Sequence, residues 1–340
     1  MINIHLIIQG PIYSISPPDD IFFGNTKYRF DCRDNIKALI KKYSSLFSSI
    51  TLATWKNSEK LDGLDFQEIN REIPIKTIFL NDIGRGEYIF GEIPDDRLRQ
   101  YYSVLKGLEY INSKYGNKNI SLKIRTDQFL DLEDIINQTI SKDLINSNKL
   151  LFPFALEGQL FSVNDYFIAG NTKPMINYFT HLVDNVDIPV ASKSIHVDWV
   201  QKYLSLHIKD VNKKSYKPKF TIAGTRTMRG SLIPLPKSHI VEWIKLLEKY
   251  FFLSDPTWIT NTTVRGKSLD FLSKKIFNED LKNYQSIFNK LTIYNKRKLV
   301  KDNLITNFIF GEFNNPYKNS NFGKYLYKFN YFLRMFLLSF

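Results

Sequence analysis

The chain has 340 residues and a formal net charge of +13, and its hydrophobic and charged shares of 43% and 24% are ordinary for a folded protein. The single cysteine, Cys32, excludes an internal disulfide and a cysteine-rich zinc site. No apolar run reaches the roughly 20 residues that a membrane-spanning helix needs, so we expect a cytoplasmic protein. The positive charge favours anionic neighbours such as phosphorylated substrates, nucleic acid or a membrane surface.

Strand and helix patterns alternate over the first 130 residues. Apolar strands are predicted at residues 2–10, 48–55, 73–82 and 120–127. Helices are predicted at residues 34–47, with Asp34 as the N-cap, and at residues 94–116, which have an acidic first turn. Such alternation implies crossover connections and a mostly parallel sheet flanked by helices.

The second half of the chain has a different pattern. Residues 149–171 predict strands broken by turns, and helical patterns follow at residues 172–186, 194–208 and 238–252. After Glu312 there is no acidic residue, and residues 318–340 interleave lysine and arginine with Phe, Tyr and Leu. This tail suits an amphipathic helix at the anionic inner face of a membrane. Packing on the core, or pairing with a second subunit as a homodimer, explains the same pattern.

Polar residues follow four of the predicted strands, at the point where each strand ends. Gln9 and Gly10 follow the first strand, and Arg125 to Asp127 follow the fourth. The other two strands end on Thr54 with Trp55 and on Asn81 with Asp82. Ligands of parallel sheets bind outside the carboxyl ends of the strands, so these residues predict a polar site along one edge of the sheet.

The charged strand end suggests phosphate chemistry. Asp127 can hold a divalent cation that neutralises a substrate diphosphate, and Arg125 can pair with phosphate directly. The alternative is that both residues only solvate the end of the strand. Arg99 and Gln100 fall in the opening turns of the long helix, where anions are attracted, although exposed helix charges are common.

A candidate general base lies in the segment "SIHVDW". Asp198 or His196 could remove a proton from an acceptor hydroxyl, or could instead cap a helix. We rank Asp198 first because a carboxylate is ionised at neutral pH. The chain contains no glycine-rich phosphate loop, which argues against an ordinary kinase or ATPase.

The sequence resembles the WavE lipopolysaccharide-synthesis family of glycosyltransferase-like bacterial proteins. The matching segments occur in order as "IIQGPIY", "ITLATW", "DRLRQYYSVLKGLEY", "LKIRTD" and "FSVNDYFIAGN". The resemblance implies a GT-A-like fold, that is, a Rossmann-type mostly parallel sheet flanked by helices, here with a helical C-terminal extension. The resemblance covers about residues 3–171. We assign the donor- and acceptor-binding catalytic domain to residues 1–250 and the basic, aromatic-rich extension to residues 251–340.

The resemblance also implies the roles of individual residues. GT-A enzymes bind Mg²⁺ or Mn²⁺ through an Asp-x-Asp element, and "RTD" takes that place here with one carboxylate, Asp127. Arg125 would then do part of the cation's work. The implied donor-binding positions are Gln9, Gly10, Pro11, Thr54, Trp55, Arg99, Gln100 and Arg125.

We therefore expect a glycosyltransferase of lipopolysaccharide, O-antigen or capsule synthesis at the cytoplasmic face of the inner membrane. It would move a sugar from an activated nucleotide- or phosphate-linked donor to a saccharide or lipid-linked acceptor, with inversion and with Asp198 as the base. A sugar-phosphate transferase would use the same site. A non-catalytic scaffold for anionic glycan or nucleic acid is the third reading, although no nucleic-acid-binding module is recognisable and no nucleic-acid partner is expected.

Overall fold

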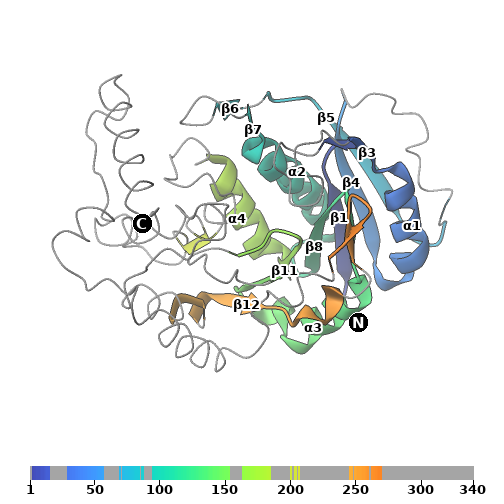
Figure 1. The fold of residues 1–340 in the computed structure, drawn as a ribbon. Coiled ribbons are helices and arrows are strands. Elements are labelled where there is room, and N and C mark those ends of the chain that lie inside the picture. Colours follow the sequence, from blue (N-terminus) through green and yellow to red (C-terminus); the bar gives the residue numbers. More distant parts are fainter. Residues whose placement is uncertain are drawn as a thin grey trace, which may run out of the picture.

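A seven-stranded sheet with helices on both faces dominates the computed structural model (Figure 1). The structure describes residues 2–15, 29–56, 69, 71–84, 86–87, 94–153, 163–184, 200, 203–204, 206, 245–247, 249–259 and 262–269.

The strand order of this sheet is β12-β10-β11-β8-β1-β4-β5. β1 lies parallel to both β4 and β8, and β5 is parallel to β4. β11 runs antiparallel to β8, and β10 is antiparallel to β11 and parallel to β12. The bounds of the seven strands are β1 Ile4–Gln9, β4 Ser49–Trp55, β5 Ile75–Leu80, β8 Ile120–Arg125, β10 Leu150–Phe152, β11 Ile168–Asn171 and β12 Phe251–Leu253.

Shorter elements surround the sheet. β2 pairs with β3, β6 pairs with β7, and β14, β13 and β9 form a small three-stranded sheet. Their bounds are β2 Tyr13–Ile15, β3 Arg29–Asp31, β6 Gly86–Glu87, β7 Pro94–Asp95, β9 Gln128–Phe129, β13 Thr263–Val264 and β14 Lys267–Ser268, and the 3₁₀ helices are η1 Ser44–Leu46, η2 Leu144–Asn146 and η3 Pro256–Ile259.

Four α-helices that the structure describes over their full length divide between the two faces of the sheet: α1 Arg33–Tyr43, α2 Arg97–Tyr115, α3 Leu132–Ser141 and α4 Thr172–Asp184. Leu6 and Ile8 of β1 share a core with residues of α1 and α3, whereas Ile7 packs with residues of α2 and α4. Successive residues of a strand point to opposite faces. Ile4, Leu6, Ile7 and Ile8 are therefore all buried, because both faces of the strand are covered.

Helix α2 lies very close to β1, and the sequence allows this at Gly107. A Cβ atom at this position would lie only 2.9 Å from Ile7 Cγ2. Because the helix can approach this closely, its N-terminal turn is brought to the carboxyl end of β1. The close packing therefore contributes directly to the site described below.

The predicted fold class is confirmed: the central sheet is mostly parallel and flanked by helices. Ile120, Leu122 and Ile124 point to one face of β8, as their spacing predicted. Two helix starts differ. The predicted helix at residues 94–116 begins at Arg97, because Pro94 and Asp95 pair as β7, so its acidic residues precede the first turn. The other difference is that α1 begins at Arg33 with Cys32 at the N-cap. Asp34 therefore lies in the first turn of the helix, where its charge is still favourable at the positive end of the dipole.

The sheet domain continues past the predicted boundary at residue 250. Residues 251–253 form β12 at the edge of the central sheet, and residues 263–268 form a hairpin against β9. Sequence periodicity placed residues 251 and 252 at the end of a helix, but pairing with β10 makes them a strand. Residues 270–340, including the amphipathic segment 318–340, lie outside the described residues, so the extension and its membrane or dimer contact stay predictions.

The strand order reverses direction at β1. From β1 the chain adds β4 and then β5 on one side, and it later returns to add β8 on the other side. Such a switch point leaves a crevice outside the carboxyl ends of the strands, where ligands bind in open α/β sheets.

Within the described part of the chain, no helix combines the length and the apolar character needed to cross a bilayer.

Candidate active site

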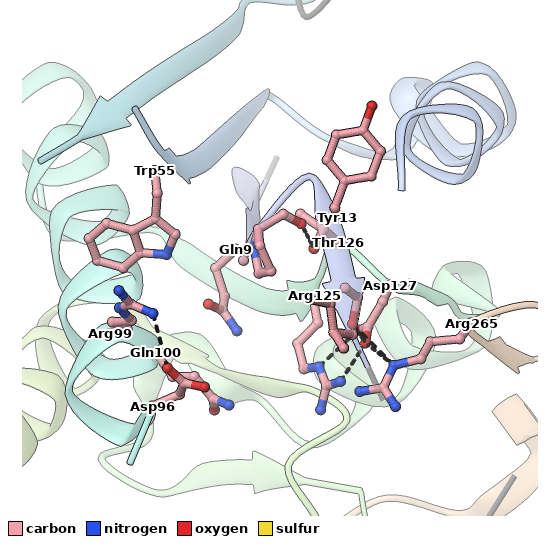
Figure 2. A pocket seen from close by; sticks show the side chains of 14 residues that line it. Gln9, Tyr13, Trp55, Asp96, Arg99, Gln100, Arg125, Thr126, Asp127 and Arg265 are labelled. Carbon is pink, nitrogen blue, oxygen red and sulfur yellow. Dashed lines mark hydrogen bonds and ion pairs between the residues drawn. The ribbon is translucent and has the colours of Figure 1, made fainter. Parts of the chain in front are cut away.

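A pocket of about 220 Å³ opens at the carboxyl ends of β1, β4 and β8. These three strands are neighbours, so their polar ends converge as the sequence predicted. Figure 2 shows side chains of the pocket at two ends, with Trp55 and Arg99 at one end and Arg125, Asp127 and Arg265 at the other. The pocket is lined by Gln9, Gly10, Pro11, Tyr13, Ser14, Ile15, Trp55, Asp96, Arg99, Gln100, Arg125, Thr126, Asp127 and Arg265.

The segment after β1 is joined tightly to the segment after β8. The backbone N–H of Thr126 donates to the carbonyl oxygen of Gln9 at 3.0 Å, and Thr126 Oγ1 donates to the carbonyl oxygen of Pro11 at 2.8 Å. Gly10 has a φ of +133°, and a Cβ atom there would lie 2.8 Å from Thr126 Oγ1. Only glycine combines this backbone conformation with this close approach.

The amide of Gln9 lies between the two ends of the pocket (Figure 2). The residue is only 2% exposed, and the hydroxyl of Ser103 on α2 donates to Gln9 Oε1 at 2.9 Å. This bond fixes the orientation of the amide, so that its N–H groups are presented toward the pocket. A buried amide donor held in this way can bind an oxygen of a ligand that reaches both ends.

The carboxylate of Asp127 accepts four hydrogen bonds from side chains. Arg125 donates from Nε to Oδ1 at 2.9 Å and from Nη2 to Oδ2 at 2.6 Å. Ser14 Oγ donates to Oδ2 at 2.9 Å, and Arg265 Nε donates to the same oxygen at 3.1 Å. Three of these bonds reach Oδ2 and one reaches Oδ1, so the donors engage both oxygens of the carboxylate.

This arrangement stabilises the ionised form of Asp127. Burial alone would raise the pKa of this carboxyl, but the charge and hydrogen bonds of Arg125 and the charge of Arg265 outweigh burial and lower the pKa to about 2. Burial likewise opposes the charge of Arg125, but Asp127 and Asp165 raise the pKa of the guanidinium above its ordinary value. Arg125 and Asp127 are therefore both ionised at neutral pH, and with the guanidinium of Arg265 the Arg125–Asp127–Arg265 cluster has a net positive charge.

Lys123 lies two residues before Arg125 on the same face of β8 and is 0% exposed. Its Nζ donates to the carbonyl oxygen of Asp165 at 3.1 Å. Burial lowers the pKa of Lys123 to about 8, with the charge of Asp165 opposing that shift. The side chain is thus mostly protonated at neutral pH and adds positive potential behind Arg125.

Arg265 reaches the pocket from a tight hairpin turn. β13 and β14 are joined by Arg265 and Gly266, which have φ values of +49° and +75°. Two consecutive positive φ values are typical of the turn that best fits a two-residue hairpin. A non-glycine residue in this conformation carries a cost of roughly 1–2 kcal/mol. The backbone N–H of Arg265 is held by the carbonyl oxygen of Asp127 at 2.7 Å.

The other end of the pocket is aromatic and cationic. The rings of Trp55 and Tyr102 are stacked, with centroids 6.5 Å apart and an interplanar angle of 17°. Arg99 donates from Nε to Asp82 Oδ1 at 2.9 Å and from Nη1 to Asp96 Oδ1 at 3.2 Å. Asp82 follows β5, so the polar end that the sequence predicted for this strand also contacts the site, through Arg99.

The predicted donor-binding positions line the pocket with one exception, Thr54. Its side chain is fully buried, and its Oγ1 has no hydrogen-bond partner in the structure. Thr54 precedes Trp55 on β4, so the two side chains point to opposite faces of the sheet. Asp198 and His196 lie outside the described residues, and their predicted role as a base stays a prediction.

Sequence reasoning missed several pocket residues. Tyr13 and Ser14 belong to the "QGPIYS" segment, so their proximity to Gln9 was a usable signal. Asp96 is the residue before α2, in the acidic turn that marked the start of this helix. Arg265 had only a weak signal: an Arg-Gly pair between two short runs rich in Thr and Ser. No sequence pattern near either residue indicates that Arg265 contacts Asp127.

The pocket residues do not fit a divalent metal ion held by Asp127. Hard cations take several oxygen ligands. Over the described ranges, no cluster of three or more His, Cys, Asp or Glu side chains is placed to hold a metal. Asp127 accepts hydrogen bonds from Ser14, Arg125 and Arg265, and the two guanidinium groups among these donors would repel a metal ion. The resemblance implied a metal site at this position, but the donor set built here favours binding of an anion.

No protein-family model matches the chain, and no curated protein matches it. Solved structures show distant similarity. The 4-diphosphocytidyl-2C-methyl-D-erythritol synthase of Anaerococcus prevotii has 13% sequence identity and a TM-score of 0.35 over 61% of this chain and 84% of that one. A glycosyltransferase involved in the glycosylation of the major capsid of PBCV-1 has 10% identity and a TM-score of 0.34 over 61% and 78%. At this distance the chemistry of the pocket follows from its own residues.

Proposed function

We propose that the chain is a glycosyltransferase that uses a nucleotide-diphosphate-linked sugar. The observation that carries this proposal is the convergence of Trp55, Gln9 and Arg125 in one pocket at the switch point of the sheet. An aromatic side chain suits the base or the sugar of such a donor, and guanidinium groups suit its diphosphate. The buried amide of Gln9 lies between these two ends, where it would bind a connecting oxygen.

The chemistry requires stabilisation of a leaving group. The acceptor hydroxyl oxygen forms a bond to the anomeric carbon, the bond from that carbon to the phosphate oxygen breaks, and the nucleoside diphosphate leaves. Negative charge develops on the departing phosphate, and Arg125 would stabilise it with preorganised donors. Asp127 and Lys123 set the position and the potential of this guanidinium. We propose Asp198 as the base that takes the proton of the acceptor hydroxyl, with inversion at the anomeric carbon.

The biological setting of the proposal comes from the sequence. The resemblance to the WavE lipopolysaccharide-synthesis family favours an acceptor that is a growing surface polysaccharide, lipopolysaccharide, O-antigen or capsule. The basic, aromatic segment 318–340 favours a location at the cytoplasmic face of the inner membrane, where lipid-linked acceptors are found. Deleting this segment and measuring binding to anionic vesicles tests that part independently.

A donor screen tests the proposed function directly. The purified full-length chain would be incubated with nucleotide sugars and free nucleoside diphosphates, and the thermal shift would be measured. Donors that bind would then be incubated with saccharide acceptors, and the product mass would be measured. A gain of one sugar residue supports a glycosyltransferase, whereas a gain of a sugar phosphate identifies the rival sugar-phosphate transferase.

Matched variants separate a pocket from a merely basic surface. Trp55→Ala and Arg125→Lys should weaken donor binding, since Lys cannot reproduce the bidentate geometry of Arg. Arg71→Ala is the control: this exposed residue precedes β5, at the end of that strand opposite the pocket. If polyanions bind with a steep salt dependence and all three variants behave alike, the chain is a scaffold and the enzyme proposal is wrong.

A further inference from the structure

We propose that Arg125 and Arg265 form a metal-independent clamp for the phosphate of the leaving group, and that Asp127 is its positioning residue. This inference rests on the proposed function and changes the role that the sequence suggested for Asp127. A carboxylate after a parallel strand is expected to hold a cation. Here it holds two guanidinium groups instead (Figure 2).

The bonding of the carboxylate is the first argument. Asp127 is 3% exposed and accepts hydrogen bonds from Ser14, Arg125 and Arg265 through both of its oxygens. A metal ion needs a lone pair on an oxygen, and only Oδ1, which accepts a single bond from Arg125, keeps one. A metal ion bound there would lie directly beside the guanidinium of Arg125. The two positive guanidinium groups would also repel a second cation at this distance. The same charges attract a phosphate.

The charge of the cluster is the second argument. One carboxylate between two guanidinium groups leaves the Arg125–Asp127–Arg265 cluster with a net positive charge. Behind it, the buried Lys123 adds a positive charge and Asp165 a negative one, so the net charge stays positive. Arg125 Nη1 lies 4.0 Å from Asp165 Oδ2, beyond ordinary hydrogen-bond reach. Arg125 and Arg265 both line the pocket. A phosphate bound there would meet donors whose positions are already set before it arrives.

The hairpin that carries Arg265 is the third argument. β13 pairs with β9, the strand that begins directly after Asp127, with Val264 opposite Gln128. This register brings both the backbone N–H and the side chain of Arg265 to Asp127. The turn position has a positive φ, which Gly or Asn would adopt more easily than Arg. An arginine in a conformation that disfavours it is well explained if its guanidinium has a function.

Binding of inorganic pyrophosphate and of nucleoside diphosphates to the full-length chain tests the clamp. Affinity would be measured by calorimetry in EDTA and again with Mn²⁺. We expect binding in EDTA, and we expect Arg125→Ala, Arg265→Ala and Asp127→Asn each to weaken it about tenfold or more, as for the loss of a charge-assisted pair. Arg71→Ala and Asp184→Asn are exposed controls and should leave affinity unchanged.

The positioning role of Asp127 has its own signature. If Asp127 acts only by holding the guanidinium groups, its substitution should cost little further affinity once Arg265 is lost. The loss of affinity in the double variant Asp127→Asn with Arg265→Ala should therefore be far smaller than the sum of the losses in the two single variants. Melting temperatures of all variants identify any that fail to fold. If another variant fails to fold, Arg265→Ala still tests the clamp, because the side chain that it removes lies on a peripheral hairpin.

The outcomes separate the clamp from the proposed function. Pyrophosphate binding in EDTA without any nucleotide preference supports the clamp and contradicts the nucleotide-sugar donor. A different result would overturn the clamp: nucleoside diphosphates bind only with Mn²⁺, Asp127→Asn abolishes this binding, and Arg265→Ala retains it. Asp127 would then be a metal ligand, and the proposed donor class would still stand. If no arginine variant weakens the binding of pyrophosphate or of nucleoside diphosphates, the clamp is excluded.

Discussion

The backbone N–H of Arg265 donates a hydrogen bond of 2.7 Å to the carbonyl oxygen of Asp127, across 138 residues of sequence. The guanidinium of the same residue donates to the carboxylate of Asp127. One residue thus fixes both the main chain and the side chain at the end of β8. The pocket is therefore completed by a segment that the periodicity of the sequence assigned to a separate extension.

Replacing Gly10 by Ala should destabilise the fold by roughly 1–3 kcal/mol, through strained backbone and a forced shift of Thr126. The added Cβ would lie 2.8 Å from Thr126 Oγ1 at a φ of +133°. Urea unfolding measures the loss. Gly116→Ala is the control, because Gly116 also has a positive φ, of +80°, but no atom lies within 4 Å of its added Cβ. Equal losses in the two variants would mean that the contact with Thr126 is unimportant.

Replacing Ser103 by Ala should weaken donor binding about fivefold, the effect of losing one hydrogen bond of about 1 kcal/mol. The buried amide of Gln9 would lose the donor that fixes its orientation at 2.9 Å. Titration with the donor that binds best measures the change. Ser113→Ala on the same helix is the matched control. Ser103 and Ser113 each lie within hydrogen-bond distance of the backbone carbonyl three residues earlier, but Ser113 is exposed and lies away from the pocket. An unaffected Kd in Ser103→Ala would show that this bond does not position Gln9.

The stability of the chain should fall in strong acid because of Asp127. Its pKa in the folded protein is about 2, below the ordinary value of 3.8, so the folded state binds fewer protons than the unfolded state between these values. This contribution, on the order of 2 kcal/mol, is complete above pH 3.8 and is lost as the pH falls through 2. Acid unfolding of Asp127→Asn should lack this component. Asp184→Asn is the exposed control, and equal acid unfolding of the two variants would contradict the prediction.

Lys123 should make the protein more stable as the pH rises above neutral. Its pKa is about 8 in the folded state and 10.5 in the unfolded state, so the unfolded state binds more protons between these values and stability rises with pH. The cost of burying the charge, on the order of 3 kcal/mol, is present below pH 8. Lys123→Met should remove this rise, which unfolding at pH 7 and at pH 10 can measure. The same variant should bind phosphate ligands more weakly, because positive potential behind Arg125 is lost.

The sequence by itself determined the class of the fold and much of the site. Strands buried on both faces must be apolar throughout, and helices between them must carry an apolar stripe, so local periodicity marks both. Parallel strands share the edge at which they end, so the polar residues at Gln9, Trp55 and Arg125 had to meet. These features depend on neighbours within one element, which a sequence displays directly.

Only the tertiary structure decided how the ends of the strands are bonded. Thr54 and Trp55 looked alike in sequence, but the pleat of β4 buries Thr54 away from the pocket. Asp127 looked like a cation ligand in the sequence, but in the structure its carboxylate binds the guanidinium groups of Arg125 and Arg265. The partner that matters most, Arg265, is brought in by the pairing of β13 with β9. Contacts between distant segments depend on register and packing, which leave no local pattern in the chain.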